Sequence, residues 1–231
     1  MVNIKGTLMP SKIIIAPSIL AADFANLEQE TKAVLAAGAD VIHFDVMDFH
    51  FVPNLSVGPF VCTALRRAGI IAPIEAHLMV DEPEKYIEPF AKAGANILTF
   101  HAETAKNPAK LIDAIHRTGM KAGIAFNPET PFALEVELVQ KLALILIMSV
   151  HPGFAGQKFI PEALEKIKQA RACVTKNKTK TFVAVDGGIK LSNIDQVAKA
   201  GADFIVLGSG IFEAEDYAER IQALREKLSG C

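Results

Sequence analysis

The sequence predicts a protein of the α/β class that folds as a single (β/α)8 TIM barrel. Three observations support this prediction: strand-like and helix-like segments alternate along the chain, a glycine-containing motif recurs at their junctions, and polar residues gather at the ends of the strands. A chain of 231 residues is long enough for one such barrel, so we expect one domain over residues 1–231. A doubly wound open sheet is the alternative architecture.

Strands are indicated by short apolar runs rich in β-branched and aromatic residues. These runs recur at residues 12–18, 41–47, 72–79, 96–101, 120–126, 142–149, 181–186 and 203–208. Apolar residues at spacings of three and four predict helices over residues 25–35, 84–92, 108–117, 162–174, 193–199 and 216–228. This alternation favours parallel strands, and the absence of a linker rich in proline and glycine favours closure into a barrel.

One motif recurs at three of the junctions. Residues 37–44, 93–100 and 200–207 each begin with Ala-Gly-Ala followed by Asp or Asn, and each continues as an apolar run. The pattern predicts a helix that is ended by a glycine in the left-handed conformation and followed at once by a buried strand. The first and second glycines of the motif are separated by about two units of roughly 27 residues, and the second and third by about four. The length of the chain corresponds to between eight and nine such units.

The composition excludes several classes of protein. Hydrophobic residues make up 51% and charged residues 22% of the chain, and the formal net charge is -2. These values predict neither a disordered chain nor a basic surface that binds nucleic acid. No apolar run approaches the ~18 residues of a membrane-spanning helix. We therefore expect small-molecule partners, with no nucleic acid and no membrane.

Two features bear on the cellular compartment. Cys62, Cys173 and Cys231 are odd in number and widely spaced, as is typical of proteins from a reducing compartment. The apolar run 13–22 follows Lys5 and Lys12 and has about the length of a secretory signal core. Cleavage after it would remove the first predicted strand, so we expect a cytoplasmic protein.

Polar side chains stand at the carboxyl ends of the predicted strands, where barrels of this kind carry their active sites. Because strand side chains alternate between faces, one set can face the barrel axis at one level. This set comprises Ser18, His43, Asp45, His77, Met79, Met148 and Asp186. Its two histidines and two aspartates suit one divalent metal ion: Zn²⁺ foremost, with Fe²⁺, Mn²⁺ or Co²⁺ as alternatives. A metal-free cluster of hydrogen-bonded polar groups is the other interpretation.

Two further polar residues lie near this set. His101 ends the fourth predicted strand, and we expect it to support the site from behind. Glu75 precedes His77 by two residues, one layer deeper in the barrel, and we expect it to orient that imidazole or to fill a polar layer.

Glycine-rich turns follow the last three predicted strands. They are residues 151–157, residues 186–188 and residues 208–210. Glycine lets backbone N–H groups approach an anion closely, and the loops after strands seven and eight commonly bind phosphate in barrels. Three such turns side by side predict a phosphate site.

These residues resemble the ribulose-phosphate 3-epimerase family, also called the pentose-5-phosphate 3-epimerase family. The resemblance rests on residues 16–20 (APSIL), 43–48 (HFDVMD), 50–54 (HFVPN), 77–80 (HLMV), 148–157 (MSVHPGFAGQ) and 185–189 (VDGGI), and it runs nearly end to end. It implies a ribulose-phosphate-binding barrel, an isomerase of the pentose phosphate pathway in carbohydrate metabolism. We also expect a homo-oligomer that binds a small phosphosugar.

The resemblance also implies roles for individual residues. The metal would be bound by His43, Asp45, His77 and Asp186, and the catalytic acid and base would be Asp45 and Asp186. Substrate would be contacted by Ser18, His77, Gly153, Phe154, Ala155, Gly156, Asp186, Gly187, Gly188, Gly208 and Ser209. The sulfur atoms of Met47, Met79 and Met148 would support the planar intermediate, although core packing explains them equally well.

The implied reaction interconverts D-ribulose 5-phosphate and D-xylulose 5-phosphate. One aspartate removes the C3 proton and the other delivers a proton to the opposite face, through a metal-stabilised enediolate. Two alternatives remain open: a 3-epimerase of a six-carbon ketose phosphate such as D-allulose 6-phosphate, and a non-catalytic barrel that binds phosphosugar. Two positions depart from the family pattern, Phe49 in place of glycine and His151 in place of asparagine or an acidic residue.

Overall fold

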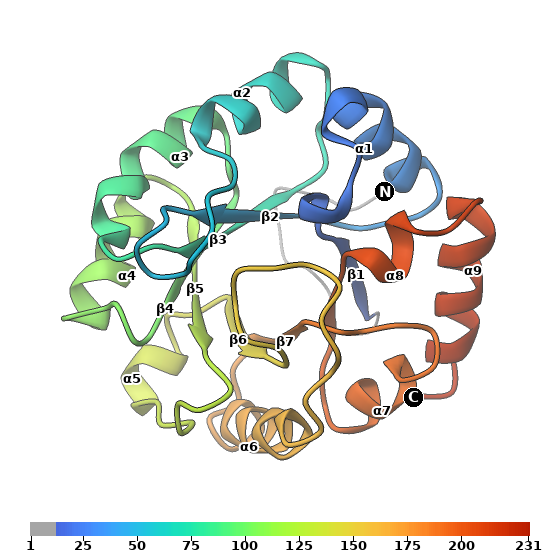
Figure 1. Ribbon diagram of the computed structural model, residues 1–231. Coiled ribbons are helices and arrows are strands. Elements are labelled where there is room, and N and C mark those ends of the chain that lie inside the picture. Colours follow the sequence, from blue (N-terminus) through green and yellow to red (C-terminus); the bar gives the residue numbers. More distant parts are fainter. Residues whose placement is uncertain (1–12) are drawn as a thin grey trace.

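Eight parallel strands form one closed sheet, which confirms the predicted (β/α)8 barrel (Figure 1). The structure is a computed structural model that describes residues 13–231, so Lys5 and the predicted start of the first strand at Lys12 lie outside the described residues. The strands are β1 Ile14–Pro17, β2 Ile42–Met47, β3 Ile74–Met79, β4 Ile97–His101, β5 Lys121–Phe126, β6 Leu144–Met148, β7 Phe182–Asp186 and β8 Phe204–Leu207. All eight fall within the runs predicted from the sequence.

The helices form a ring outside the strands (Figure 1). They are α1 Leu27–Ala36, α2 Pro59–Arg67, α3 Ile87–Ala93, α4 Pro108–Arg117, α5 Val136–Val139, α6 Ala163–Lys176, α7 Ile194–Lys199, α8 Ser209–Phe212 and α9 Tyr217–Leu228, with short 3-10 turns η1 Ile19–Ala21, η2 Phe24–Asn26 and η3 Pro83–Tyr86. All six predicted helices are present. The sequence analysis missed α2, α5 and α8, because α2 begins with residues that also suit strands and because α5 and α8 have only four residues each, too few to show a helical period.

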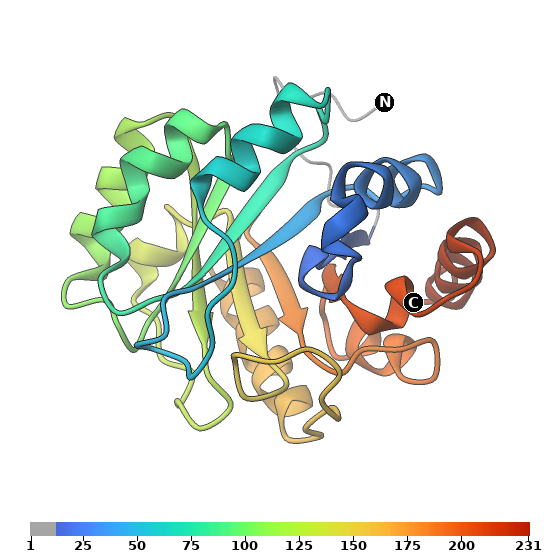
Figure 2. The same ribbon diagram turned by 45° about the horizontal axis from the view of Figure 1, so that its top comes forward.

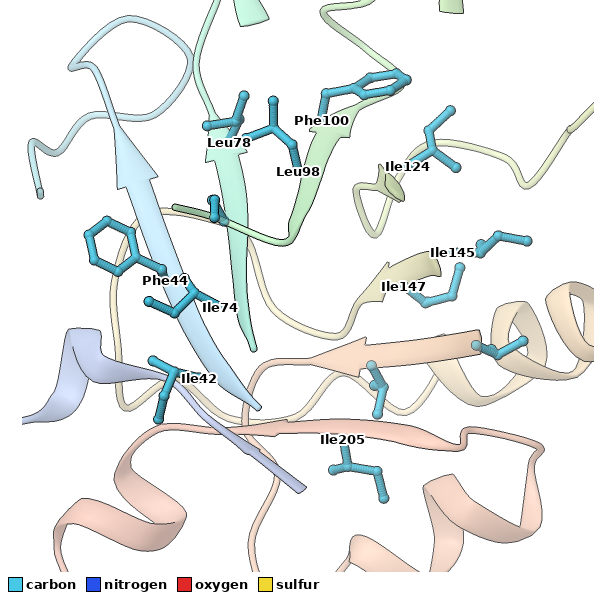
Figure 3. Close-up of a cluster of buried hydrophobic side chains, with 14 of the residues drawn as sticks. Ile42, Phe44, Ile74, Leu78, Leu98, Phe100, Ile124, Ile145, Ile147 and Ile205 are labelled. Atoms are coloured by element: carbon cyan, nitrogen blue, oxygen red, sulfur yellow. The ribbon is translucent and has the colours of Figure 1, made fainter. Parts of the chain in front are cut away.

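The sheet separates two buried layers. Alternate side chains of the strands point outward and pack against the helices, as Ile42, Phe44, Leu78 and Phe100 do (Figure 3). The intervening side chains fill the barrel interior, where Leu144, Leu146, Phe182, Ala184, Phe204 and Val206 pack together. This apolar layer closes the amino-terminal end of the barrel, and the buried polar cluster described below lies beyond it, towards the carboxyl ends of the strands.

A buried aspartate closes the seam between the first and second strands. The N–H of Asp40 donates to the carbonyl of Ile15 (3.0 Å), and the Asp40 carboxylate accepts from the Ile15 N–H (2.9 Å). Arg225 of α9 forms an ion pair with the same carboxylate and donates to the carbonyl of Gly38 (3.0 Å). A bridge between Ser18 and His43 completes the seam.

The other two copies of the Ala-Gly-Ala motif make the same contacts. Asn96 accepts from the N–H of Ile74 and from Arg66, while Asp203 accepts from the N–H of Val183 and from Arg171. In both copies the arginine also donates to the carbonyl of the motif glycine. In each copy the Asp or Asn of the motif therefore joins the starts of two neighbouring strands, and an arginine from an outer helix binds the same Asp or Asn side chain.

None of the helices within residues 13–231 has both the length and the apolar character that are needed to cross a lipid bilayer.

Replacing Asp40 tests the seam. We expect Asp40→Ala to lower the free energy of unfolding by about 3 kcal/mol, because it leaves the Ile15 N–H and the Arg225 guanidinium without their buried partner. Asp40→Asn should cost only about 1 kcal/mol, since Asn96 fills the same role in its own copy of the motif. Urea unfolding measures both. Asp113→Ala, which removes an exposed ion pair with Lys141, serves as control and should leave the midpoint unchanged; an equal effect of Asp40→Ala and Asp113→Ala would contradict the prediction.

Candidate metal centre and substrate pocket

Four potential ligand atoms converge at the carboxyl ends of three strands. His43 and Asp45 lie on β2, His77 on β3 and Asp186 at the end of β7, and one atom from each lies within 4.8 Å of the other three. Parallel pairing brings them together: Asp45 stands directly opposite His77 in the ladder between β2 and β3. The structure therefore assembles all four residues that the sequence analysis named as ligands.

The spacing of these atoms suits a tetrahedral ion. His43 Nε2 lies 3.1 Å from Asp45 Oδ1 and 3.7 Å from Asp186 Oδ2, and His77 Nδ1 lies 3.2 Å and 3.9 Å from the same two oxygens. Zinc bound at about 2.0–2.1 Å would hold tetrahedral ligands roughly 3.3 Å apart. A small contraction of the cluster would therefore bring two nitrogen and two oxygen ligands into a tetrahedral arrangement.

The charge of the cluster also favours a cation. Three carboxylates, those of Asp45, Glu75 and Asp186, surround two imidazoles with little solvent contact. Within the described chain, neither oxygen of Glu75 accepts a well-aligned hydrogen bond. Buried negative charge in excess is costly unless a positive charge compensates it, and a divalent ion would do so.

Nδ1 of His43, the ring nitrogen on the side away from the cluster, forms an ion pair with Glu75. The sequence analysis expected Glu75 to orient His77 or to fill a polar layer, and the ion pair with His43 shows that the first of these expectations was wrong. Glu75 stands opposite His43 in the ladder between β2 and β3, whereas His77 lies one layer further along the same strand. The cross-strand neighbour at the same level is the closer partner.

The outer nitrogen of His77 contacts a second histidine. His77 Nε2 lies 2.8 Å from His101 Nε2, and the two rings stack with centroids 4.9 Å apart. His101 Nδ1 in turn lies 3.1 Å from Glu103 Oε2. The expectation that His101 supports the site from behind is confirmed, whereas Glu103, in a loop and outside any strand pattern, was not singled out.

The protein environment separates the pKa values of the two aspartates. Burial opposes ionisation of Asp45, but His43 and His77 hold its pKa well below the usual range. Burial, together with the charge of Asp45, raises the pKa of Asp186 to about 6, even though His43 favours its ionised form. For His43 itself burial lowers the pKa, but Glu75 and Asp45 outweigh it and raise the pKa well above its usual value. Paired carboxylates with such different proton affinities are typical of acid–base sites.

An open pocket of about 540 Å³, including its solvent-filled mouth, lies over this cluster. Its lining contains all the residues predicted to contact substrate except His77: Ser18, Gly153, Phe154, Ala155, Gly156, Asp186, Gly187, Gly188, Gly208 and Ser209. It also contains Asp45 and the three methionines predicted to support the intermediate, Met47, Met79 and Met148. His43 and His77 are fully buried behind this lining. Ser18 donates to Asp45 Oδ2 at 2.5 Å, so it orients the carboxylate as well as lining the pocket.

One side of the pocket is formed by the three glycine turns. Gly187 and Gly188 have φ angles of 115° and 66°, and a side chain at Gly188 would lie 2.4 Å from the backbone nitrogen of Phe159. Among the described residues, the N–H groups of Gly188 and Ser209 have no protein acceptor. Free N–H groups beside a pocket are suited to bind an anion. The loop after β6 extends beyond the ends of the strands (Figure 2), and its residues Gly153 to Gly156 line the pocket.

Two polar residues, Asn54 and Ser149, hold the loops around the pocket, and sequence reasoning assigned them no role. Asn54 donates to the carbonyl of Gly153 (2.6 Å) and joins the loop after β2 to the loop after β6. Ser149 donates to the carbonyls of Asp186 and Gly187. These bonds join segments 37 to 99 residues apart, so no local pattern could reveal them.

The two departures from the family pattern have different surroundings. Phe49 adopts the left-handed conformation (φ 62°) in the turn that pairs Asp48 with Leu55, and its side chain is largely exposed. This conformation explains why glycine suits the position. The side chain of His151 is exposed, and its Nδ1 lies 3.1 Å from Oε1 of Glu129.

Fold and site together define a (β/α)8 barrel with a His/Asp cluster, of a kind that could bind a divalent metal ion, beneath a glycine-lined pocket. Comparison with known sequences gives the family. The chain belongs to the ribulose-phosphate 3-epimerase family, whose sequence model matches residues 14–212. It is 48% identical over 216 residues to ribulose-phosphate 3-epimerase of Escherichia coli strain K12, covering 94% of this chain and 96% of that protein. The enzyme of that name from Serratia marcescens is 50% identical over 206 residues, covering 89% and 98%.

Solved structures with distant sequences share the fold. A 3-hexulose-6-phosphate synthase superposes with a TM-score of 0.68 at 19% identity and covers 94% of this chain and 100% of that one. Orotidine 5'-phosphate decarboxylase from Pyrococcus horikoshii OT3 gives a TM-score of 0.66 at 15% identity, with the same coverage. At these identities the likeness concerns the barrel alone.

Replacing Phe49 tests the strain in its turn. We expect Phe49→Gly to raise the free energy of unfolding by up to about 1 kcal/mol, because the relief of a left-handed conformation exceeds the entropy cost of glycine. Phe60 is also exposed but lies in α2, so Phe60→Gly should destabilise by about 1 kcal/mol. Urea unfolding of both variants measures the contrast, and a loss of stability in Phe49→Gly similar to that in Phe60→Gly would contradict the prediction.

Proposed function

We propose that this protein interconverts D-ribulose 5-phosphate and D-xylulose 5-phosphate by moving the proton at C3 from one face to the other. One observation carries this proposal: Asp45 and Asp186 stand on strands separated by β1 and β8, yet both side chains enter one pocket beside the metal cluster. Epimerisation needs a proton to leave one face of a carbon and another to arrive on the opposite face, and two carboxylates of this kind can serve both faces. The names of the relatives support the same reaction.

We assign the metal to His43, Asp45, His77 and Asp186, and zinc is the ion we propose. The donor set of two imidazoles and two carboxylates, at nearly tetrahedral spacing, is of the kind zinc accepts. When bound, the ion supplies Lewis-acid stabilisation of the negative charge that develops on the substrate oxygens. Anomalous scattering at the metal edge would identify it.

The aspartates have complementary roles in proton transfer. In one direction Asp45, which the histidines keep ionised, accepts the C3 proton. Asp186 has the higher proton affinity of the two, because burial and the charge of Asp45 raise its pKa to about 6, and the carboxylate oxygen that is not a metal ligand delivers a proton to the other face. In the reverse direction the two exchange roles, since each carboxylate can carry one proton.

The rest of the pocket positions the substrate. The free N–H groups of Gly188 and Ser209, with the turn from Gly153 to Gly156, would bind the phosphate. Met47, Met79 and Met148 line the pocket with 3%, 2% and 2% exposure, so they exclude water and present sulfur to a flat intermediate. Binding energy at the phosphate then serves to hold C3 between the carboxylates.

Two further expectations remain predictions. We propose a homo-oligomer, for which exposed Phe60 and Ile71 are available contact residues. We also propose a cytoplasmic location, supported by the three unpaired cysteines.

Turnover measurements test the substrate assignment. We expect the zinc-loaded protein to epimerise ribulose 5-phosphate with a much higher kcat/KM than D-allulose 6-phosphate. A preference for the six-carbon sugar would overturn the assignment, and binding of both sugars without turnover would indicate a barrel that only binds phosphosugar.

Matched substitutions test the two-base scheme. We expect Asp45→Asn and Asp186→Asn each to lower epimerisation at least ~10³-fold, because an amide cannot carry the proton. Residual exchange of the C3 hydrogen in D₂O, followed by NMR, should be confined to one epimer in each variant, and to opposite epimers in the two variants. Metal content is measured alongside, and exchange of both epimers by a single variant would rule out two separate bases.

The affinity for zinc should fall as the pH is lowered from 7 to 5. The ion must displace a proton from His43, whose pKa is raised well above its usual value, and below pH 6 it also competes with a proton on Asp186, whose pKa is raised to about 6. Binding should therefore weaken by about tenfold per pH unit near pH 7 and more steeply below pH 6. Calorimetry in buffers of different ionisation enthalpy measures the protons released. Affinity independent of pH over this range would contradict the proposed ligand set.

A further inference from the structure

His101 is a buried histidine to which the proton transfer above gives no role. It ends β4, has 0% exposure and is covered by Phe51 of the loop after β2, with ring centroids 4.7 Å apart. Both of its nitrogens have partners: His77 on one side and Glu103 on the other. A buried imidazole whose two nitrogens are both bound has only one arrangement of protons that satisfies both partners.

The partners decide that arrangement. The carboxylate of Glu103 offers only acceptors, so Nδ1 of His101 carries the proton that it donates. A buried neutral imidazole has a single N–H, and its Nε2 is therefore an acceptor. Two N–H groups cannot face each other across the 2.8 Å that separates the Nε2 atoms, so Nε2 of His77 must be the donor. Its proton then lies on the side away from the metal cluster.

Glu103 itself is held in place from the next loop. Its Oε1 accepts from the N–H of Asn127 (2.8 Å). Lys166 of α6 donates to the carbonyls of Asn127, Pro128 and Thr130 at 2.7, 2.8 and 2.6 Å. One oxygen of Glu103 is thus occupied by a backbone N–H, which leaves the other directed at His101.

We propose that Glu103 is a positioning residue that acts through His101 to fix the tautomer of His77, so that Nδ1 of His77 presents a lone pair to the metal ion. This proposal rests on the metal site proposed above. Glu75 places a carboxylate directly against Nδ1 of His43. Glu103 provides the corresponding carboxylate for His77, but through the intervening imidazole of His101. Partners of this kind orient metal ligands and raise their basicity.

The substitution Glu103→Gln tests this relay. Glutamine has one acceptor oxygen in place of two, so it cannot accept from both the Asn127 N–H and His101 Nδ1. If its NH₂ group faces His101, the proton of His101 moves to Nε2, and His77 must then carry its own proton on Nδ1, where it blocks the metal. We expect Glu103→Gln to weaken zinc binding about 10- to 100-fold in a competition titration.

Glu129→Gln is the matched control. Glu129 is on the same loop as Asn127, and its charge also acts on Lys166, but its side chain is 65% exposed and pairs with His151. We expect its zinc affinity to equal that of the unmodified protein. Equal affinities in Glu103→Gln and Glu129→Gln would overturn the proposal. Urea midpoints measured on both variants separate a loss of ligand orientation from a general loss of stability.

A spectroscopic measurement on the unmodified, zinc-loaded protein needs no variant to fold. Long-range ¹⁵N–¹H correlation distinguishes the tautomers of neutral histidines, and we expect Nδ1–H for His101 and Nε2–H for His77. An Nε2–H tautomer of His101 would overturn the proposal. If the unmodified protein bound no zinc, the proposed metal site would fail, and the tautomer of His101 would still decide whether Glu103 directs the relay.

Discussion

The structure depends on how one buried cluster of like charges is compensated. Parallel strands place Asp45, Asp186 and Glu75 near one another at low solvent exposure, where carboxylates repel and are costly to bury. Two imidazoles offset part of this cost, and a divalent ion would offset the rest. The same arrangement separates the proton affinities of Asp45 and Asp186, so the feature that strains the fold is also the feature that suits proton transfer.

Buried polar and charged groups are stabilised differently at the two ends of the barrel. At the amino-terminal end, Asp40, Asn96 and Asp203 each bind the N–H that starts a neighbouring strand and receive an arginine from an outer helix. These contacts are fully satisfied within the chain and serve stability. At the carboxyl end the carboxylates keep a face open to the pocket, which leaves them able to bind a ligand. Stability and chemistry are thereby assigned to opposite ends of the same strands.

The metal ligands are supported unequally. His43 receives its carboxylate directly from the neighbouring strand, because Glu75 stands opposite it in the ladder. His77 has Thr99 opposite it on β4 and reaches a carboxylate only through His101. Glu103, the carboxylate behind His101, is bound in turn by the loop of residues 127–130, and Lys166 of α6 donates hydrogen bonds to that loop. The orientation of one ligand is therefore linked to a loop and a helix on the outside of the barrel.

By itself the sequence determined the eight strands, six of the helices, the barrel and the four residues that gather at its mouth. Local periodicity and strand alternation suffice for these, because a parallel barrel brings equivalent strand ends to one level. Only the tertiary structure decided that Glu75 pairs with His43, that Glu103 acts behind His101, and which nitrogen of each imidazole faces the cluster. Those outcomes depend on the register between strands and on contacts between loops far apart in the chain, and neither leaves a trace in a local pattern.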